Sequence, residues 1–416
     1  MISDIREWHA ESNNWQVTRK RLAAGYGYDT YGGNCHIVPN HGLIILSLLH
    51  GDDDFQKTLM IVNSCGWDTD CNSGNVGCLM GIKNGIAGIE AGPGWREPIA
   101  DRLYMPTADG GRAITDAVSE SYRIANVGRV LAGEEPAVPK DGARFHFELP
   151  GALQGFTVED SVASRDTATL RNEVGHSELG TRSLAIDYRY VALGRLARVA
   201  TPTFIPSREI ADYFEHQHYA LLASPTLHSG QTVQACITAD SENDVPVTCR
   251  LYLRAYAADD ELARIYGPVA VLAPGISHTF KWRVGDTGGM PIAEIGLEIS
   301  SPQRTDGALY LDYLTWDGVP DVVLTRPACG GTMWRRAWVD AVDHFDWRWP
   351  EAYRLVQNQG IGLLIQGSRR WTDYRASADV TPHMVEAAGL AARVQGLRRY
   401  YALLLCRGGS VRLVKA

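Results

Sequence analysis

The sequence predicts a multidomain α plus β protein: an all-α helical bundle, then an all-β jelly-roll sandwich, then a second β-sandwich that stops early. Three observations support this order. The 416 residues exceed what one hydrophobic core usually holds. Residues 1–135 show helical periodicity, whereas short strand patterns with Gly, Pro and Asp turns begin near residue 143. We therefore expect domains at 1–135, 143–320 and 321–416.

Helical patterns fill the first segment. Gly42–His50 is an apolar stretch that a glycine closes, and Asp53 is a plausible cap of the next helix. We expect two further helices, over Asn72–Gly88 and from Ile114 to about Gly133. The helix after Asp53 has an apolar face with spacing i, i+4, i+7, formed by Phe55, Leu59 and Val62.

Glycines recur at steps of three and four along the predicted helix Asn72–Gly88. Each interior glycine costs about 1 kcal/mol relative to alanine. Close approach of a neighbouring helix would offset this cost. We therefore expect this helix at the centre of a tight bundle. The glycines are Gly74, Gly77, Gly81, Gly85 and Gly88.

Strand patterns follow a proline-bearing, charged linker at Glu134–Asp141. Their regular spacing is typical of a sandwich or jelly roll. The second domain has candidate strands at Arg144–Leu149, Ser183–Tyr190, Thr232–Ala239, Pro246–Ala257, His278–Val284, Ile292–Ile299 and Ala308–Trp316. The third has them at Gly360–Gln366, Tyr374–Val380, Leu390–Val394, Tyr400–Cys406 and Val411–Val414.

Composition excludes several classes of partner. The formal net charge of −8 disfavours nucleic-acid binding, which needs clustered cations. The sequence contains no apolar run long enough to span a bilayer, and its first fifteen residues lack a signal-peptide pattern, which favours a cytoplasmic location. The eight cysteines form no CxxC pair. We expect buried, reduced thiols at Cys35, Cys65, Cys71 and Cys78.

The segment Gly66–Gly74 carries the strongest chemical signal. Asp68 and Asp70 flank a threonine just before a predicted helix. Carboxylate oxygens suit hard cations such as Mg²⁺, Mn²⁺ or Ca²⁺. The alternative is that Asp70 or Asn72 only caps the helix. An EF-hand loop is excluded, because serine replaces its sixth-position glycine and leucine its twelfth-position glutamate.

In its order of elements, residues 25–105 resemble the C-terminal part of the ADP-ribosylglycohydrolase family. The resemblance runs through Cys35–Asn40, Leu43–Gly51, Asp54-Phe55 and the segment from Gly66 to Gly81. It implies that Asp68 and Asp70 bind metal, with Cys71 where many members have threonine. It also implies a substrate cleft near His36, Asn40 and Trp67. The alternative role for His36 is a helix-end or buried hydrogen-bonding histidine.

The resemblance implies a metal-dependent glycohydrolase that uses two Mg²⁺ or Mn²⁺ ions to cleave an N- or O-glycosidic bond of an ADP-ribosyl or other glycosyl substrate. The family's Thr/Ser-Asp-Asp element does not occur before Gly25, and Asp52–Asp54 matches a surface turn instead. We therefore expect a fragment, or a site that another chain completes, and little or no activity of this chain alone. No catalytic general base can be assigned.

The β segments resemble sugar-binding modules. Gly307–Gly318 is similar to the last strands of jelly-roll carbohydrate-binding modules, and the third segment to laminin-G or lectin-like sandwiches. Asp312 would bind a structural Ca²⁺ or be a hydrogen-bonded aspartate. The tryptophans would pack in the core or stack on sugars; the candidates are Trp334, Trp338, Trp347 and Trp349.

Three functions therefore stay open. The first is the glycohydrolase, acting on a glycosidic small molecule, a glycan or an ADP-ribosylated substrate. The second is a non-catalytic carbohydrate-binding protein. The third is an assembly subunit that completes a metal site across chains. Ion binding beside Asp68 and Asp70 distinguishes the first from the second.

Overall fold

The computed structural model describes all residues except 34, 106, 108, 218, 328–329 and 347–351. The chain forms two compact units, Met1–Ile99 and Ala100–Ala416. The boundary predicted near residue 135 lies inside the second unit. The predicted fold class, a helical region followed by β-sandwich sheets, is confirmed.

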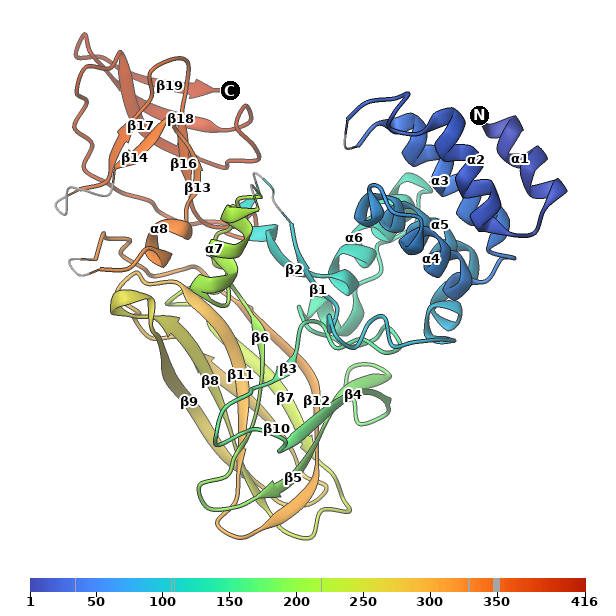
Figure 1. Ribbon diagram of the computed structural model, residues 1–416. Coiled ribbons are helices and arrows are strands. Elements are labelled where there is room, and N and C mark those ends of the chain that lie inside the picture. Colours follow the sequence, from blue (N-terminus) through green and yellow to red (C-terminus); the bar gives the residue numbers. More distant parts are fainter. Residues whose placement is uncertain (34, 106, 108, 218, 328–329, 347–351) are drawn as a thin grey trace. The chain divides into compact units, whose positions relative to one another are not determined.

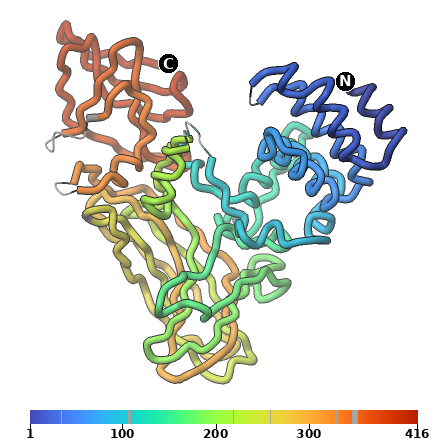
Figure 2. The backbone as a smooth tube through the Cα atoms, viewed as in Figure 1, coloured from blue at the N-terminus to red at the C-terminus, as the bar shows by residue number. Residues whose placement is uncertain are grey.

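The first unit consists of helices, drawn in blue in Figure 2. Helix α3 packs against α1, α2, α4 and α5. The helices are α1 (Ile2–Glu11), α2 (Trp15–Tyr26), α3 (Ile37–His50), α4 (Phe55–Ser64) and α5 (Thr69–Glu90). One core cluster contains Ile5, Leu22, Leu43, Leu46, Ile61 and Cys65, and a second contains Phe55, Leu59, Val62, Val76 and Met80. Among the described residues, no helix has both the length and the apolar character of a membrane span.

The acidic turn before α4 acts as a cap, one residue later than predicted. The Asp54 carboxylate, not that of Asp53, accepts the Lys57 backbone N–H at 2.6 Å. Asp52 and Asp53 have left-handed backbones, with φ of 53° and 60°. Their carboxylates form exposed ion pairs with Lys57 and Lys83. The three aspartates thus form a cap and a solvated turn, as the sequence indicated.

The glycines of α5 do not pack as predicted. A Cβ atom built at Gly74 or Gly85 meets nothing within 4 Å, and one at Gly77 meets only Leu59, at 3.7 Å. Gly85 has φ 68° and ψ −173°, so it interrupts the helix. The neighbouring side chain of Ile82 is 80% exposed. The expectation of a tightly packed glycine face is therefore wrong for the described residues, because α5 buries Val76 and Met80 instead.

The second unit is built around a β-sandwich (Figure 1). One antiparallel sheet has the order β10-β7-β12-β5-β4, and the other has the order β3-β6-β11-β8-β9. Apolar side chains from both sheets share one core. The first sheet comprises β4 (Ala168–Val174), β5 (Arg182–Val191), β7 (Thr232–Ala239), β10 (Ser277–Arg283) and β12 (Thr305–Asp317). The second comprises β3 (Thr157–Val158), β6 (Ala197–Pro202), β8 (Val247–Tyr256), β9 (Leu262–Leu272) and β11 (Ile292–Ser300).

Shorter elements surround the sandwich. The hairpin β1 (Arg102–Tyr104) and β2 (Ile114–Asp116) leads into α6 (Ala117–Leu131), and α7 (Arg208–His216) follows β6. The C-terminal segment contains α8 (Met333–Arg336) and three small antiparallel sheets. Their strands are β13 (Val339–Ala341), β14 (His344–Asp346), β15 (Arg354–Val356), β16 (Leu363–Ile365), β17 (Ala387–Ala392), β18 (Tyr401–Cys406) and β19 (Val411–Lys415).

Two predicted strands do not form. Arg144–Leu149 makes only an isolated bridge, from Phe145 to Leu314, because Phe147 has a left-handed backbone with φ 59°. Tyr374–Val380 has no regular structure, since most of it is exposed and pairs with no described strand.

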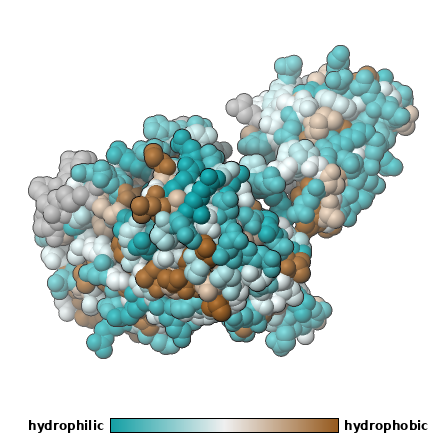
Figure 3. Space-filling view, turned by 90° about the horizontal axis from the view of Figure 1, so that it is seen from below, coloured by the Kyte–Doolittle hydropathy of each residue, from teal (hydrophilic) through white to brown (hydrophobic). Residues whose placement is uncertain are grey.

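The tryptophans of the C-terminal segment favour the packing interpretation where they are described. Trp334 is buried, and its ring stacks on Tyr353 with centroids 5.9 Å apart. Trp338 is half-buried and meets the same tyrosine edge-on at 5.4 Å. Trp347 and Trp349 lie outside the described residues. Other apolar residues do reach the surface, in patches that Figure 3 shows on one face.

Candidate metal centre

A strained turn leads into helix α5. Gly66 and Trp67 both have left-handed backbones, with φ of 73° and 63°. This conformation costs about 1–2 kcal/mol for a residue with a Cβ atom. Two contacts hold Trp67 there: the Tyr28 ring stacks on the indole at 5.0 Å, and the Arg19 guanidinium lies 3.7 Å from its centroid. The turn therefore places Asp68 at the N-cap position of α5.

The Asp68 carboxylate is oriented by a residue of helix α3 and not by the backbone of its own helix, α5. It makes no capping hydrogen bond. Instead, Asn40 Nδ2 donates to Asp68 Oδ2 at 3.0 Å. Asn40 is buried, and its Oδ1 accepts the Tyr28 hydroxyl at 2.8 Å. A chain of hydrogen bonds from Tyr28 through Asn40 thus orients the Asp68 carboxylate.

Asp68, Asp70 and Cys71 form one cluster. A potential ligand atom of each lies within 4.8 Å of the others, and Asp70 and Cys71 are exposed. The Asp68 carboxyl and the backbone N–H groups of Cys71 and Asp70 hold the pKa of Asp70 below its usual value. The hydrogen bond to Asp68 raises the pKa of the Cys71 thiol. Two carboxylates this close repel each other unless a proton or a cation lies between them.

The carboxylates fit a hard cation, and the thiol does not. Ligand oxygens lie about 2.0–2.1 Å from Mg²⁺, so two of them are at most about 4.2 Å apart. The ligand atoms of Asp68 and Asp70 lie within 4.8 Å of each other, close to that limit. Cys71 stays protonated, and sulfur is in any case a poor Mg²⁺ ligand. Within the described ranges, no other group of three His, Cys, Asp or Glu side chains converges in this way.

The predicted cleft residues have different roles. Asn40 and Trp67 lie beside the carboxylate cluster, linked through Tyr28. His36 is the N-cap of α3, and its Nδ1 accepts the Val38 backbone N–H at 3.2 Å. His36 therefore makes the contact of a helix-end histidine, which was the alternative to a role in the cleft.

Sequence reasoning missed Tyr28 and Cys35. Partial desolvation, and then the charge of Asp68, raises the pKa of the exposed Cys35 thiol, so this thiol lies near the cluster. The expectation of four buried thiols is wrong, because Cys35, Cys71 and Cys78 are exposed and only Cys65 is buried. A tyrosine twelve positions from its asparagine partner leaves no local pattern. Only the family resemblance, which begins at Gly25, covered this stretch.

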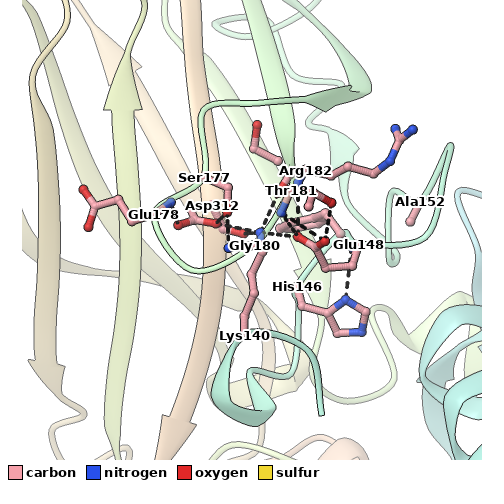
Figure 4. Close-up of polar contacts among 12 residues, drawn as sticks. Lys140, His146, Glu148, Ala152, Ser177, Glu178, Gly180, Thr181, Arg182 and Asp312 are labelled. Carbon is pink, nitrogen blue, oxygen red and sulfur yellow. Dashed lines mark hydrogen bonds and ion pairs between the residues drawn. The ribbon is translucent and has the colours of Figure 1, made fainter. Parts of the chain in front are cut away.

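The other candidate ion site, at Asp312, is filled by protein groups (Figure 4). Lys140 Nζ lies 2.6 Å from Asp312 Oδ1, and both side chains are fully buried. The Ser177 hydroxyl donates to the same oxygen at 2.6 Å, and the Glu178 N–H donates to the other at 2.8 Å. The Lys140 ammonium group thus lies beside the Asp312 carboxylate. Of the two predicted roles, a Ca²⁺ ligand or a hydrogen-bonded aspartate, the structure shows the second.

Comparison with known proteins gives two kinds of match. The family model of ADP-ribosylglycohydrolase matches residues 1–127, less than a third of the chain, which confirms the predicted resemblance. No curated protein matches.

Solved structures that match include β-sandwich modules. One, described as a carbohydrate-binding module of the β-sandwich superfamily, aligns at TM-score 0.31 and 14% identity, over 44% of this chain and 65% of that one. A family 22 xylan-binding domain from Paenibacillus barcinonensis aligns at TM-score 0.30 and 10% identity, over 42% of this chain and 93% of that one. A second family 22 xylan-binding domain aligns at TM-score 0.30 and 10% identity, over 43% and 95%.

Proposed function

We propose that this chain is part of a metal-dependent glycohydrolase whose Asp68 and Asp70 hold Mg²⁺ or Mn²⁺. One observation carries the proposal. Two carboxylates face each other at the start of α5, inside the segment that matches the ADP-ribosylglycohydrolase model. The positive end of a helix dipole favours ionised carboxylates at this position. The substrate class is an N- or O-glycoside, with ADP-ribosyl compounds as the leading candidates.

The surrounding residues prepare the carboxylates for a ligand. Asn40 uses its amide to fix one Asp68 oxygen. Metal sites depend on such supporting hydrogen bonds for ligand orientation. Trp67 is half-buried next to the cluster, where Tyr28 and Arg19 pack against its ring and fix the turn that presents Asp68. When bound, divalent cations would polarise substrate hydroxyls and orient a water.

A two-ion site needs more ligands than this pair supplies. Asp68 and Asp70 contribute two carboxylates, and the Cys71 thiol is a poor third ligand. We propose that ligands from outside the described residues, supplied by further sequence or by another chain, complete it. This arrangement also accounts for the expected low activity of the chain by itself.

Manganese binding tests the proposal directly. We expect electron paramagnetic resonance titration to detect Mn²⁺ bound to the purified chain, with Mg²⁺ competing. The double variant Asp68→Asn, Asp70→Asn should lose this binding. Asp53→Asn is the matched control, because its carboxylate lies in the exposed turn and pairs with Lys83; it should bind Mn²⁺ normally.

Two outcomes would contradict the proposal. Equal Mn²⁺ binding by the parent and the double variant would place the ion elsewhere. Absence of Mn²⁺ binding, together with binding of a neutral glycan, would favour the non-catalytic carbohydrate-binding alternative. Circular dichroism of the double variant checks that the helices persist.

A further inference from the structure

A second site lies in a cleft of the second unit, next to the end of β12. It has a volume of about 120 Å³, and its lining includes five arginines but only three carboxylates. An apolar cavity of similar size, about 150 Å³, holds a benzene-sized ligand. The cleft is slightly smaller than that cavity, so it holds the charged end of a ring compound rather than a whole sugar, and its charges are not balanced.

Each carboxylate of the cleft already has partners. Asp109 pairs with Arg369 at 3.0 Å. Glu120 forms ion pairs with Arg112 and Arg123. These two acids therefore account for three of the five guanidinium groups.

The third acid, Asp116, accepts the backbone N–H of Ser119 at 2.8 Å and the hydroxyl of the same residue at 2.7 Å. Burial raises the pKa of Asp116 to about 6. Its oxygens thus cap the start of α6, and its carboxylate forms no ion pair with a described arginine.

Two guanidinium groups remain without an acid. Among the residues that the structure describes, neither Arg144 nor Arg370 forms an ion pair with a carboxylate. Arg144 is fixed: its guanidinium lies 4.2 Å from the centroid of the Trp316 ring, and Nε is 3.5 Å from that residue's carbonyl oxygen. Burial, and then the charge of Arg370, holds the pKa of Arg144 well below its usual value. Neighbouring guanidinium groups with no counter-ion make a place where an anion is strongly favoured.

The rest of the lining suits a polyhydroxylated ligand. Hydroxyl oxygens line the same cleft. Those of Thr115, Ser119, Thr201 and Thr226 already donate hydrogen bonds within the protein, so toward a ligand they act as acceptors for its hydroxyl groups. A bare inorganic ion would leave most of this space and these groups unused. They belong to Thr115, Ser119, Thr201, Thr226 and Ser368.

We propose that this cleft binds the carboxylate-bearing end of the ring of an acidic sugar, and that Arg144 and Arg370 donate hydrogen bonds to the carboxylate. The planar fork of arginine matches a carboxylate with two parallel hydrogen bonds. The sugar hydroxyls then face the threonines and serines. This site is separate from the carboxylate cluster of the first unit and does not depend on a metal.

Isothermal titration calorimetry of the full chain tests this assignment with three probes. D-glucuronate should bind, D-glucose should bind at least tenfold more weakly, and inorganic phosphate should bind more weakly than glucuronate. The Arg370 side chain is exposed and pairs with none of the described residues, so the variant Arg370→Gln should fold and should weaken glucuronate binding at least tenfold. Arg144→Lys, which keeps the charge but removes the fork, should also weaken it.

Arg407→Gln is the matched control, because this exposed arginine only approaches Glu386, at 3.7 Å. It should bind glucuronate like the parent. Equal affinity for glucuronate and glucose would overturn the proposal, and so would an equal loss of affinity in the Arg407 and Arg370 variants. Phosphate binding as tightly as glucuronate would reduce the cleft to a simple anion site. Failure of the manganese experiment leaves this test unaffected.

Discussion

Aspartates serve opposite purposes in the two units of this protein. In the sandwich, the Asp312 carboxylate is fully buried and has an ammonium group and two hydrogen-bond donors on its oxygens. In the helical unit, Asp68 is half-buried and Asp70 is exposed, and ligand atoms of the two carboxylates lie within 4.8 Å of each other. A carboxylate whose partners are all built in stabilises the fold. A carboxylate pair with no built-in cation is available for a ligand.

Asp116 is an intermediate case that sharpens this contrast. It is buried like Asp312, but none of the described cationic side chains forms an ion pair with it, and hydrogen bonds from Ser119 and Gln154 support it instead. Its pKa rises to about 6, mainly through burial. Burial alone therefore does not determine how an aspartate behaves; the charge of the group beside it does.

Removing the ammonium partner of Asp312 should give the largest effect. We expect Lys140→Met to destabilise the second unit by about 3–5 kcal/mol, because it leaves an uncompensated buried charge. Urea denaturation measures this change. Lys83→Met is the control, because its pair with Asp53 is exposed and is worth about 0–1 kcal/mol. If both variants lose a similarly small free energy of unfolding, the buried Asp312 pair does not differ from an exposed ion pair.

The pH dependence of stability tests Asp116. The folded pKa of about 6 lies above the unfolded value near 3.8, so its contribution to stability is full below about pH 4 and is lost as the pH rises through 6. The shift corresponds to roughly 3 kcal/mol. The stability difference between Asp116→Asn and the parent should therefore move in favour of the variant by up to that amount from pH 4 to pH 7. In the exposed Asp160→Asn, denaturation curves should show no such change.

Asn40 links the carboxylate cluster to the helical core. Asn40→Ala removes its hydrogen bonds to Asp68 and Tyr28, and we expect a loss of about 1–3 kcal/mol in stability. Mn²⁺ affinity should fall about 10–100-fold, because a metal ligand loses its orienting partner. Tyr28→Phe keeps the Asn40–Asp68 contact, so it should lower affinity less. If the two variants bind Mn²⁺ equally weakly, Asn40 does not orient Asp68.

The smallest effect on stability should come from Asp70. This side chain is exposed, so Asp70→Asn should change the unfolding free energy by no more than about 0.5 kcal/mol in the absence of metal. Saturating Mg²⁺, at about 100 times the dissociation constant, should stabilise the parent by about 2.7 kcal/mol and leave the variant unchanged. Thermal unfolding with and without EDTA measures both. A large loss without metal would make Asp70 a structural residue like Asp312.

Local pattern determined which segments are helices and which are strands. The alternation in Thr232–Ala239 predicted β7 at the bounds observed, and the predicted Asn72–Gly88 helix lies inside α5. The aspartates before that helix were also evident from their spacing. Several strands were not predicted. β4 and β9 lie at the ends of their sheets, so many of their side chains are exposed and the apolar alternation is weak, whereas the short β6 is buried between β3 and β11 and shows no alternation.

Tertiary structure alone decided which distant side chains meet. Lys140 and Asp312 are 172 positions apart, and Asn40 and Asp68 are 28 apart. The cleft with Arg144 and Arg370 combines residues from the hairpin, the sandwich and the C-terminal segment. Periodicity reports only which face of an element is buried. Strand order, register and loop path determine what lies opposite that face, and these depend on packing over the whole unit.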